Sequence, residues 1–229
     1  LGFTAGSPPG CSLGLTPSGL VRATYPFDAV THAQMGRIRP RGLWRGSSLG
    51  WEFPLAAAET LLERFGNRFR VDEELLRWLH WHRHPLPPLP HHRELIAHAD
   101  LNQPLADGRR PLPHQRSGAR WLLARRGALL TDEMGLGKTL TALLAARALV
   151  RVVPLRLLVV APVGLHPHWQ REASAVDLEV CLHSWARLPS DLPEAGTIMV
   201  VDEAHYAQTM QAQRPQALLR LARHPRLRA

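Results

Sequence analysis

Hydrophobic and polar positions in the first half of the chain follow a small set of recognisable spacings. Apolar residues recur every three or four positions over residues 54–66 and again over 71–82, which predicts two amphipathic helices. Ahead of them, three aromatic residues stand among glycines and serines over residues 44–53, which favours a short β-hairpin. Together these elements predict a small α+β module over residues 30–82, near the lower size limit for independent folding.

From residue 111 onward, continuous apolar runs alternate with amphipathic stretches. Runs rich in Leu, Val and Ile predict strands, a short one at 128–130 and longer ones at 155–161, 178–182 and 197–201. The stretches beside them predict helices at 114–126, 138–150, 167–173 and 215–223. Buried strands connected by helices are typical of a parallel sheet covered on both faces. Residues 111–229 therefore predict an α/β nucleotide-binding domain.

Two segments lack a sustained period. Residues 1–29 are rich in Gly, Ser, Pro and Thr, which predicts an irregular N-terminal arm. Residues 83–110 include the run HPLPPLPHH, whose prolines remove backbone donors and favour an extended chain. We interpret this second segment as a linker with one short helix near residues 94–98, although a proline-rich run also suits a ligand for SH3-like domains.

Basic residues outnumber acidic ones by 28 to 19 among the 229 residues, which gives a net charge of +9. The excess favours a polyanionic partner, because phosphate contacts release condensed counterions; a solvated basic surface is the alternative. Cys11 and Cys181 form no C-x-x-C pair, so the sequence favours a reducing compartment, the cytoplasm with its nucleoid or the nucleus, over secretion. No apolar run is long enough to span a membrane. The chain begins at Leu1 without a signal-peptide pattern, and we expect it to be a piece of a longer protein.

The turn DEMGLGKT, from Asp132 to Thr139, is the strongest chemical signal. Gly135 and Gly137 would let backbone amides converge on a phosphate, and the predicted helix after them adds its positive end. Lys138 is expected to neutralise the β- and γ-phosphates, and the Thr139 hydroxyl to bind Mg²⁺. Asp132 stands where the strict P-loop pattern has Gly, so the alternative is a glycine-rich turn with a chance lysine. The predicted nucleotide-binding residues of this loop are Asp132, Glu133, Met134, Gly135, Leu136, Gly137, Lys138 and Thr139.

The tetrapeptide DEAH, from Asp202 to His205, follows the third long apolar run directly. In P-loop ATPases the acid at that strand end holds Mg²⁺ beside the loop hydroxyl, so Asp202 is an expected Mg²⁺ ligand. Glu203 is expected to polarise the attacking water and, with Lys138, to be catalytic. A helix-capping Asp or a solvated Glu–His pair is the alternative, but a separation of about 60 residues from the loop suits paired ATPase motifs. His205 is expected to couple the nucleotide site to nucleic acid through hydrogen bonds.

The order of four segments resembles the SNF2 family of superfamily 2 helicase-like ATPases. They are LPHQ (Leu112 to Gln115), DEMGLGKT, LLVVAPVGLHPHWQRE (Leu157 to Glu172) and DEAH, similar to that family's motifs Q, I, Ia and II. The resemblance implies a RecA-like P-loop lobe, ATP and Mg²⁺ as cofactors, and an adenine contact by Gln115, whose amide both donates and accepts. It also implies that Pro162 and Trp169 line the DNA-facing edge. A helix-capping Gln115 and a Trp169 that only packs are the alternatives.

The resemblance further implies an ATP-driven motor that tracks along the phosphate backbone of double-stranded DNA without regard to base sequence, in a process such as DNA repair. In this family ATP lies between two RecA-like lobes, and we expect the second lobe to be missing from this chain, which would hydrolyse ATP poorly alone. Another superfamily 2 helicase, acting on RNA or DNA, is one alternative. A non-catalytic nucleic-acid-binding module with an ATP fold is the other, and the presence of both Lys138 and Glu203 argues against it.

Two features of the first half invite further hypotheses. Residues 30–82 resemble the HARP-like module of annealing helicases, through Gly36 to Pro40, Trp44, Trp51 to Pro54, Leu61-Leu62 and Phe65-Gly66. That resemblance implies DNA contacts by Arg37, Arg39, Arg41 and Arg45, whereas a structural cap on the motor is the alternative. The histidines between His80 and His92 invite a zinc hypothesis, but no cysteine accompanies them and they cannot all face one point.

Overall fold

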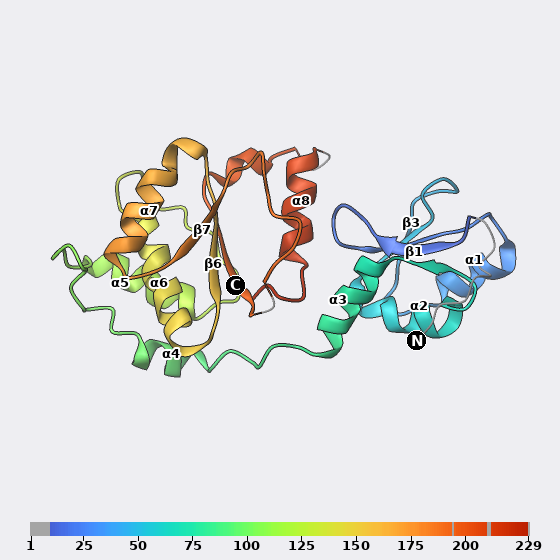
Figure 1. The fold of residues 1–229 in the computed structure, drawn as a ribbon, viewed down its shortest axis with the longest axis horizontal. Helices are drawn as coiled ribbons and strands as arrows, with labels where there is room; N and C mark the ends of the chain where they lie inside the picture. Colours follow the sequence, from blue (N-terminus) through green and yellow to red (C-terminus); the bar gives the residue numbers. More distant parts are fainter. Residues whose placement is uncertain (1–9, 194, 210–211, 229) are drawn as a thin grey trace. The chain divides into compact units, whose positions relative to one another are not determined.

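The computed structural model describes residues 10–193, 195–209 and 212–228, and it divides into two compact units. Unit 1 comprises residues 1–85 with 216–225, and unit 2 comprises residues 86–215 with 226–229 (Figure 1). Residues 1–9, the first part of the predicted N-terminal arm, lie outside the described residues. Among the described residues no helix is both long and apolar enough to cross a membrane.

A five-stranded sheet organises unit 1, in the order β3-β4-β2-β1-β5. Its strands are β1 (Ser12–Leu15), β2 (Val21–Thr24), β3 (Leu43–Trp44), β4 (Trp51–Phe53) and β5 (Arg70–Val71). Its helices are α1 (Ala29–Gly36), the 3₁₀ turn η1 (Leu55–Ala57), α2 (Ala58–Phe65) and α3 (Glu73–Arg83). The predicted hairpin over 44–53 is confirmed by the antiparallel pairing of β3 with β4. Helices α2 and α3 confirm the two helices predicted over 54–66 and 71–82.

The prediction of an irregular arm over residues 1–29 is wrong for its described part. Strands β1 and β2 pair in antiparallel register and occupy inner positions of the sheet. Leu13, Val21 and Ala23 point into the core of unit 1 and are at most 1% exposed. Each strand has only four residues, so the alternation of buried and half-exposed positions is too short to stand out from the surrounding Gly, Ser and Pro.

Unit 2 is a mixed α/β structure around a three-stranded parallel sheet in the order β7-β6-β8. Its strands are β6 (Arg156–Val160), β7 (Val180–His183) and β8 (Thr197–Val201). Its helical segments are α4 (His92–His98), α5 (Pro113–Leu123), α6 (Lys138–Val152), η2 (Val163–Leu165), α7 (His166–Ala175) and η3 (Ala204–Ala207), while α8 (Gln213–Ala222) begins here and continues in unit 1. Helices α5, α6 and α7 lie together on one side of the sheet (Figure 1). The parallel sheet and connecting helices confirm the predicted α/β class.

Helix α6 is the centre of this packing. Its residues from Leu140 to Leu149 are all buried, and α4, α5 and α7 each pack against it. Alanines and leucines at these positions are strong helix formers and leave room for neighbouring helices to approach closely. Between α5 and α6 the approach is so close that a Cβ on Gly118 would lie 2.7 Å from the Thr141 methyl group. The close packing around α6 therefore holds its first residue, Lys138, in a defined position.

The predicted short strand at residues 128–130 is absent from the structure. This segment forms no ladder with any described strand, and the Leu129 side chain is 67% exposed. A three-residue apolar run has too few positions to hold a strand without a partner to pair with. The loop before α6 is consequently supported by α5 and α6 themselves.

The predicted linker over residues 83–110 is extended only in part. Residues 85–91 have no regular structure, as the prolines predict. Leu95, Leu101 and Leu105 are at most 4% exposed and belong to the core of unit 2. Helix α4 packs on α5 and α6, so this part of the segment is core and not spacer. The three leucines lie too far apart for a periodicity to reveal them.

The chain after η3 passes through unit 1 and then returns to β8. In unit 1 the Arg220 guanidinium of α8 donates to the Thr16 carbonyl at 3.0 Å. After α8, the Thr197 amide donates to the Arg226 carbonyl at 2.9 Å. The first residue of β8 is thus anchored by the segment after α8, while its last residue leads into the DEAH tetrapeptide.

Candidate nucleotide-binding site

The glycine loop ends where α6 begins. Gly137 is the N-cap of α6 with φ +72, and Gly135 has φ +86, both in the left-handed region that favours glycine. Because the loop leads directly into α6, a helix of 15 residues, the first-turn amides and the positive end of the helix lie at the loop. The side chain of Met134 is 95% exposed and that of Leu136 is 42% exposed, which leaves this surface open to a ligand.

Lys138 lies inside the curl that this loop makes. Its Nζ donates to the Asp132 carbonyl at 2.8 Å and to the Glu133 carbonyl at 3.0 Å. It is also the only lysine in a chain with 28 basic residues of the Lys and Arg types. The next residue, Thr139, is partly exposed in the first turn of α6. An ammonium held by two weak neutral acceptors can exchange them for phosphate oxygens, which are charged and bind it more strongly.

Gln115 supports the loop from α5. The side chain is 7% exposed; its Oε1 accepts from the Leu112 amide at 2.9 Å and its Nε2 donates to the Leu136 carbonyl at 3.4 Å. The first bond caps the start of α5, which is one of the two alternatives that the sequence left open. A Cβ on Gly137 would lie 2.3 Å from Nε2, so Gln115 also requires glycine at that position. The same amide thus joins the start of α5 to the glycine loop.

The DEAH tetrapeptide begins at the carboxyl end of β8. Because β6 and β8 are parallel and in register, the Asp202 amide donates to the Val160 carbonyl at 2.8 Å. Asp202 Oδ2 accepts from Trp169 Nε1 at 2.8 Å, and Oδ1 accepts from the Glu203 amide at 2.9 Å. The Asp202 carbonyl accepts from Trp185 Nε1 at 3.0 Å. Asp202 is therefore held at its amide, its carbonyl and both carboxylate oxygens.

Glu203 and His205 extend outward from that anchored acid. Glu203 is exposed, and its backbone has φ 53, in the left-handed region. This conformation is unfavourable for any residue that has a Cβ, and it is often found at functional turns. Its Oε2 lies 3.1 Å from His205 Nδ1. The His205 ring stacks on Tyr206 with centroids 4.6 Å apart, and Tyr206 in turn lies 5.9 Å from the Trp185 ring.

The two residues predicted to face DNA, Pro162 and Trp169, differ in their exposure. Pro162 is partly exposed at the carboxyl end of β6, beside Val163, whose side chain is 66% exposed. Trp169 lies in the core of unit 2 and is 2% exposed, with its only polar side-chain atom bonded to Asp202. A buried indole has no surface to offer DNA, so the packing alternative describes Trp169 and the DNA-facing assignment is corrected.

The predicted site residues form two groups within unit 2. Gln115 and the loop gather at the start of α6, while Asp202 and its neighbours gather at the carboxyl ends of β6 and β8. Only residues 153–155 separate α6 from β6, and the two elements touch, so the chain reverses and returns toward the start of α6. Across the described part of the chain, no hydrogen bond or ion pair joins the two groups. A ligand with several phosphates is the kind of group that would bridge them.

The donor set fits a magnesium ion held together with a nucleotide. An ionised carboxylate has about four lone-pair sites, and Asp202 uses two of them for Trp169 and Glu203. Mg²⁺ usually binds one or two carboxylates and takes its other ligands from phosphates and water. In the ranges that the structure describes, no group of three or more His, Cys, Asp or Glu could hold a metal. A single carboxylate with lone-pair sites left over suits magnesium nucleotide better than an all-protein metal cage.

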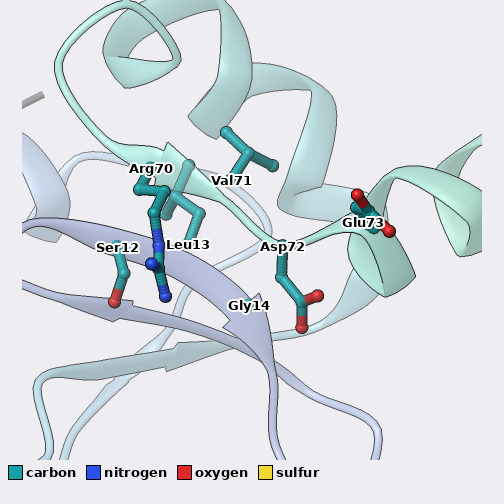
Figure 2. Close-up of a pocket in the computed structure, with 7 residues that line it drawn as sticks. All are labelled: Ser12, Leu13, Gly14, Arg70, Val71, Asp72 and Glu73. Carbon is teal, nitrogen blue, oxygen red and sulfur yellow. The ribbon is translucent and has the colours of Figure 1, made fainter. Parts of the chain in front are cut away.

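A surface hollow elsewhere carries none of these residues. It lies in unit 1, where β1 meets β5 and the start of α3, and is lined by Ser12, Leu13, Gly14, Arg70, Val71, Asp72 and Glu73 (Figure 2). Asp72 in this hollow is the N-cap of α3, and its carboxylate accepts from the Glu74 amide at 3.1 Å. The acid is thus engaged in holding a helix end.

Comparison with known proteins identifies residues 114–186 as an SNF2-related domain. The SNF2 domain-containing protein ENL1 of Oryza sativa subsp. japonica is 47% identical over 73 residues, which cover 29% of this chain and 7% of that protein. The putative ATP-dependent helicase/translocase YwqA of Bacillus subtilis is 40% identical over 86 residues, 34% of this chain and 9% of YwqA. A SWI/SNF-related matrix-associated actin-dependent regulator of chromatin subfamily A-like protein 1 of Xenopus tropicalis is 32% identical over 162 residues, 66% of this chain and 15% of that protein. The matched parts thus span a small fraction of each relative.

Among solved structures, the UvsW helicase of bacteriophage T4 aligns with a TM-score of 0.46 and 14% identity, over 91% of this chain and 88% of the other. The SNF2-related match begins at His114, the second residue of α5, and includes the rest of that helix, the glycine loop, α6, α7 and Trp185. Asp202 to His205 lie beyond its last residue.

Proposed function

Because residues 114–186 of this chain are an SNF2-related domain, we propose that the chain carries the ATP-binding part of a motor that couples ATP hydrolysis to movement along double-stranded DNA. The observation that carries this proposal is the pairing of two features in unit 2. A glycine loop holds the chain's only lysine at a helix start, and an anchored Asp-Glu pair follows the parallel strand β8.

In the proposed mechanism the loop amides and Lys138 bind the β- and γ-phosphates. The Thr139 hydroxyl and Asp202 would hold Mg²⁺, which would supply positive charge against the phosphates. Glu203 orients and polarises the attacking water, and Gln115 contacts the adenine. The exposure of Glu203 and the free lone pairs of Asp202 support these assignments.

DNA is proposed to bind through its phosphates, independently of base sequence. The net charge of +9 supports a polyanionic partner, and the edge proposed to face it is marked by Pro162, which is partly exposed, and Val163, which is exposed. His205, which contacts both Glu203 and Tyr206, is proposed to couple DNA binding to the water-activating acid. A second RecA-like lobe would close on the nucleotide and shift the grip on DNA. Such a motor acts where DNA is, in the nucleus or the nucleoid.

We also propose that the N-terminal module is HARP-like and contributes to DNA binding. The Xenopus match covers 66% of this chain, about 150 residues, which is more than residues 114–229 contain, so it includes positions before the motor domain. In unit 1 the Trp44 side chain is partly exposed, and Arg45, the next residue, is exposed. Aromatic rings beside arginines are a common surface for nucleic acid.

The single lysine makes nucleotide binding directly testable. An ATP-derived acyl phosphate, which transfers its acyl group to an amine beside the γ-phosphate, should label Lys138 of the 229-residue chain, and excess ATP with Mg²⁺ should prevent the labelling. The Lys138→Arg variant is the matched control, because it keeps the charge and lacks the reactive amine. Labelling that ATP does not prevent would contradict the proposed site.

Activity of a longer protein containing this chain distinguishes the remaining alternatives. ATPase activity that double-stranded DNA stimulates, and that Glu203→Gln abolishes, supports the proposed motor. Stimulation by single strands or RNA alone would indicate another kind of superfamily 2 helicase. DNA binding without any ATPase activity that depends on Glu203 would indicate a non-catalytic module.

A further inference from the structure

We propose that Trp169 and Trp185 are positioning residues that hold the DEAH acids in their working orientation. Trp169 Nε1 donates to Asp202 Oδ2 at 2.8 Å, and Trp185 Nε1 donates to the Asp202 carbonyl at 3.0 Å. The inference rests on the proposed function of Asp202 as a Mg²⁺ ligand. It gives the buried Trp169 a role that differs from the DNA contact implied by the sequence resemblance.

The two indoles come from different elements and are both shielded from water. Trp169 lies on α7 and is 2% exposed, whereas Trp185 follows β7 and is 4% exposed. An indole has one polar hydrogen, and a buried indole usually directs it to a partner. Both hydrogens are directed to the same acidic residue, Asp202.

The bond from Trp169 sets the orientation of the carboxylate. With Oδ2 held by the indole and Oδ1 by the Glu203 amide, the carboxylate cannot rotate without losing a hydrogen bond. The lone pairs that remain point in fixed directions, which is what a metal ion with strict octahedral geometry requires. Without the indole, the Asp202 carboxylate would have to take up its orientation when Mg²⁺ binds.

The bond from Trp185 acts on the next residue. The Asp202 carbonyl and the Glu203 amide are the two ends of one peptide group, and Trp185 holds the first while Asp202 Oδ1 holds the second. This peptide plane leads into the left-handed backbone of Glu203, with φ 53. Trp185 therefore controls the direction in which the Glu203 side chain leaves the strand end.

The test measures Mg²⁺-dependent binding of a fluorescent ATP analogue to the 229-residue chain. In Trp169→Phe the Mg²⁺ concentration at half-saturation should rise about tenfold, the usual effect of losing a partner that orients a metal ligand, while binding without Mg²⁺ stays the same. Trp121→Phe is the matched control, because that indole is 41% exposed on α5 beside the Arg125 guanidinium and far in sequence from Asp202. A Trp169→Phe midpoint equal to that of the control would overturn the inference.

A second measurement reads the contact itself, without nucleotide or metal. The chain has seven tryptophans, so a ¹H–¹⁵N spectrum shows up to seven indole signals, each assigned by its Trp→Phe variant. Asp202→Ala should shift the Trp169 signal and leave the Trp121 signal in place. A Trp169 signal that does not move would overturn the inference even if Trp169→Phe proves too unstable for the binding test.

The two experiments also separate this inference from the proposed function. If binding of the ATP analogue depends neither on Mg²⁺ nor on Asp202, as tested by Asp202→Asn, the proposed function is refuted. The shift of the Trp169 indole signal would still report on the contact between Trp169 and Asp202. Binding that needs Mg²⁺ and Asp202 but tolerates Trp169→Phe would refute the positioning role alone.

Discussion

Replacing Gly137 by Ala tests how the glycine loop is built. The substitution places a Cβ on a residue with φ +72, which costs about 1–2 kcal/mol for an L-residue in the left-handed region. That Cβ would also lie 2.3 Å from Gln115 Nε2, so the amide must move and weaken its bonds to the Leu112 amide and the Leu136 carbonyl. Such hydrogen bonds contribute roughly 1 kcal/mol. We expect Gly137→Ala to lower the free energy of unfolding of unit 2 by about 2–3 kcal/mol.

Two neighbouring glycines provide matched controls. Gly135 has φ +86, but no atom lies within 4 Å of the position that a Cβ would take, so Gly135→Ala should cost only the backbone part, about 1–2 kcal/mol. Gly127 has neither a positive φ nor a close neighbour, so Gly127→Ala should change stability by less than about 1 kcal/mol in either direction.

Urea titrations followed by tryptophan fluorescence measure the three free energies, and nucleotide binding measures the effect on function. In a Gln115→Ala background the steric part of the Gly137→Ala effect should disappear, because the clashing amide is gone. A Gly137→Ala cost no larger than that of Gly135→Ala, or one that Gln115→Ala does not reduce, would refute the reasoning.

Three further predictions concern stability and DNA binding. Burial raises the pKa of Glu52, but its hydrogen bonds from Arg22 and Arg45 outweigh burial and hold that pKa below its usual range. The two ion pairs of Glu52 therefore stabilise unit 1 fully when the pH is above 4.5, the pKa of Glu52 in the unfolded chain. This stabilisation is lost as the pH falls through the lower pKa that Glu52 has in the folded unit. Glu52→Gln should thus cost about 1–2 kcal/mol at pH 7 and less at pH 3, as thermal melts at both pH values would reveal. Leu101→Ala should lower the free energy of unfolding by about 2–5 kcal/mol, because Leu101 is 2% exposed. Leu86 lies in the extended stretch and is partly exposed, so Leu86→Ala should lower it by less than about 1 kcal/mol in the same urea titrations. Affinity for duplex DNA should be equal for unrelated sequences and fall at least about tenfold between 50 and 200 mM salt in anisotropy titrations.

Local patterns in the sequence predict most elements of unit 2, because each pattern has a physical cause within the element itself. The helix that starts at Lys138 and the strand that ends before Asp202 are both found where the spacing places them. Glycine at positions 135 and 137 is explained by the left-handed backbone there. These features depend on residues within a few positions of one another, and a single sequence contains that information.

Features that depend on distant partners were not predictable in this way. The bond between Trp169 and Asp202 joins residues 33 positions apart, and nothing in either local pattern indicates it. The buried leucines of the predicted linker likewise depend on the surface of α6, which exists only in the folded unit. The only local signal for the first contact was a tryptophan in α7, which β7 separates along the chain from the strand that ends before Asp202.

The choice of lysine at position 138 leads to a last prediction. All other basic residues of the Lys and Arg types in this chain are arginines, so a compositional preference alone would favour arginine here as well. The loop carbonyls of Asp132 and Glu133 approach Nζ to 2.8 and 3.0 Å, a curl that suits a compact ammonium. A guanidinium is a planar fork with five donors and needs flat, two-pronged acceptors.

Lys138→Arg should therefore weaken binding of the ATP analogue about tenfold or more, although the charge is unchanged, and Lys138→Ala should weaken it further. The comparison separates charge from shape at one position, because both variants are read by the same Mg²⁺-saturated titration. An arginine variant that binds as tightly as the lysine would mean that charge alone recruits the phosphates.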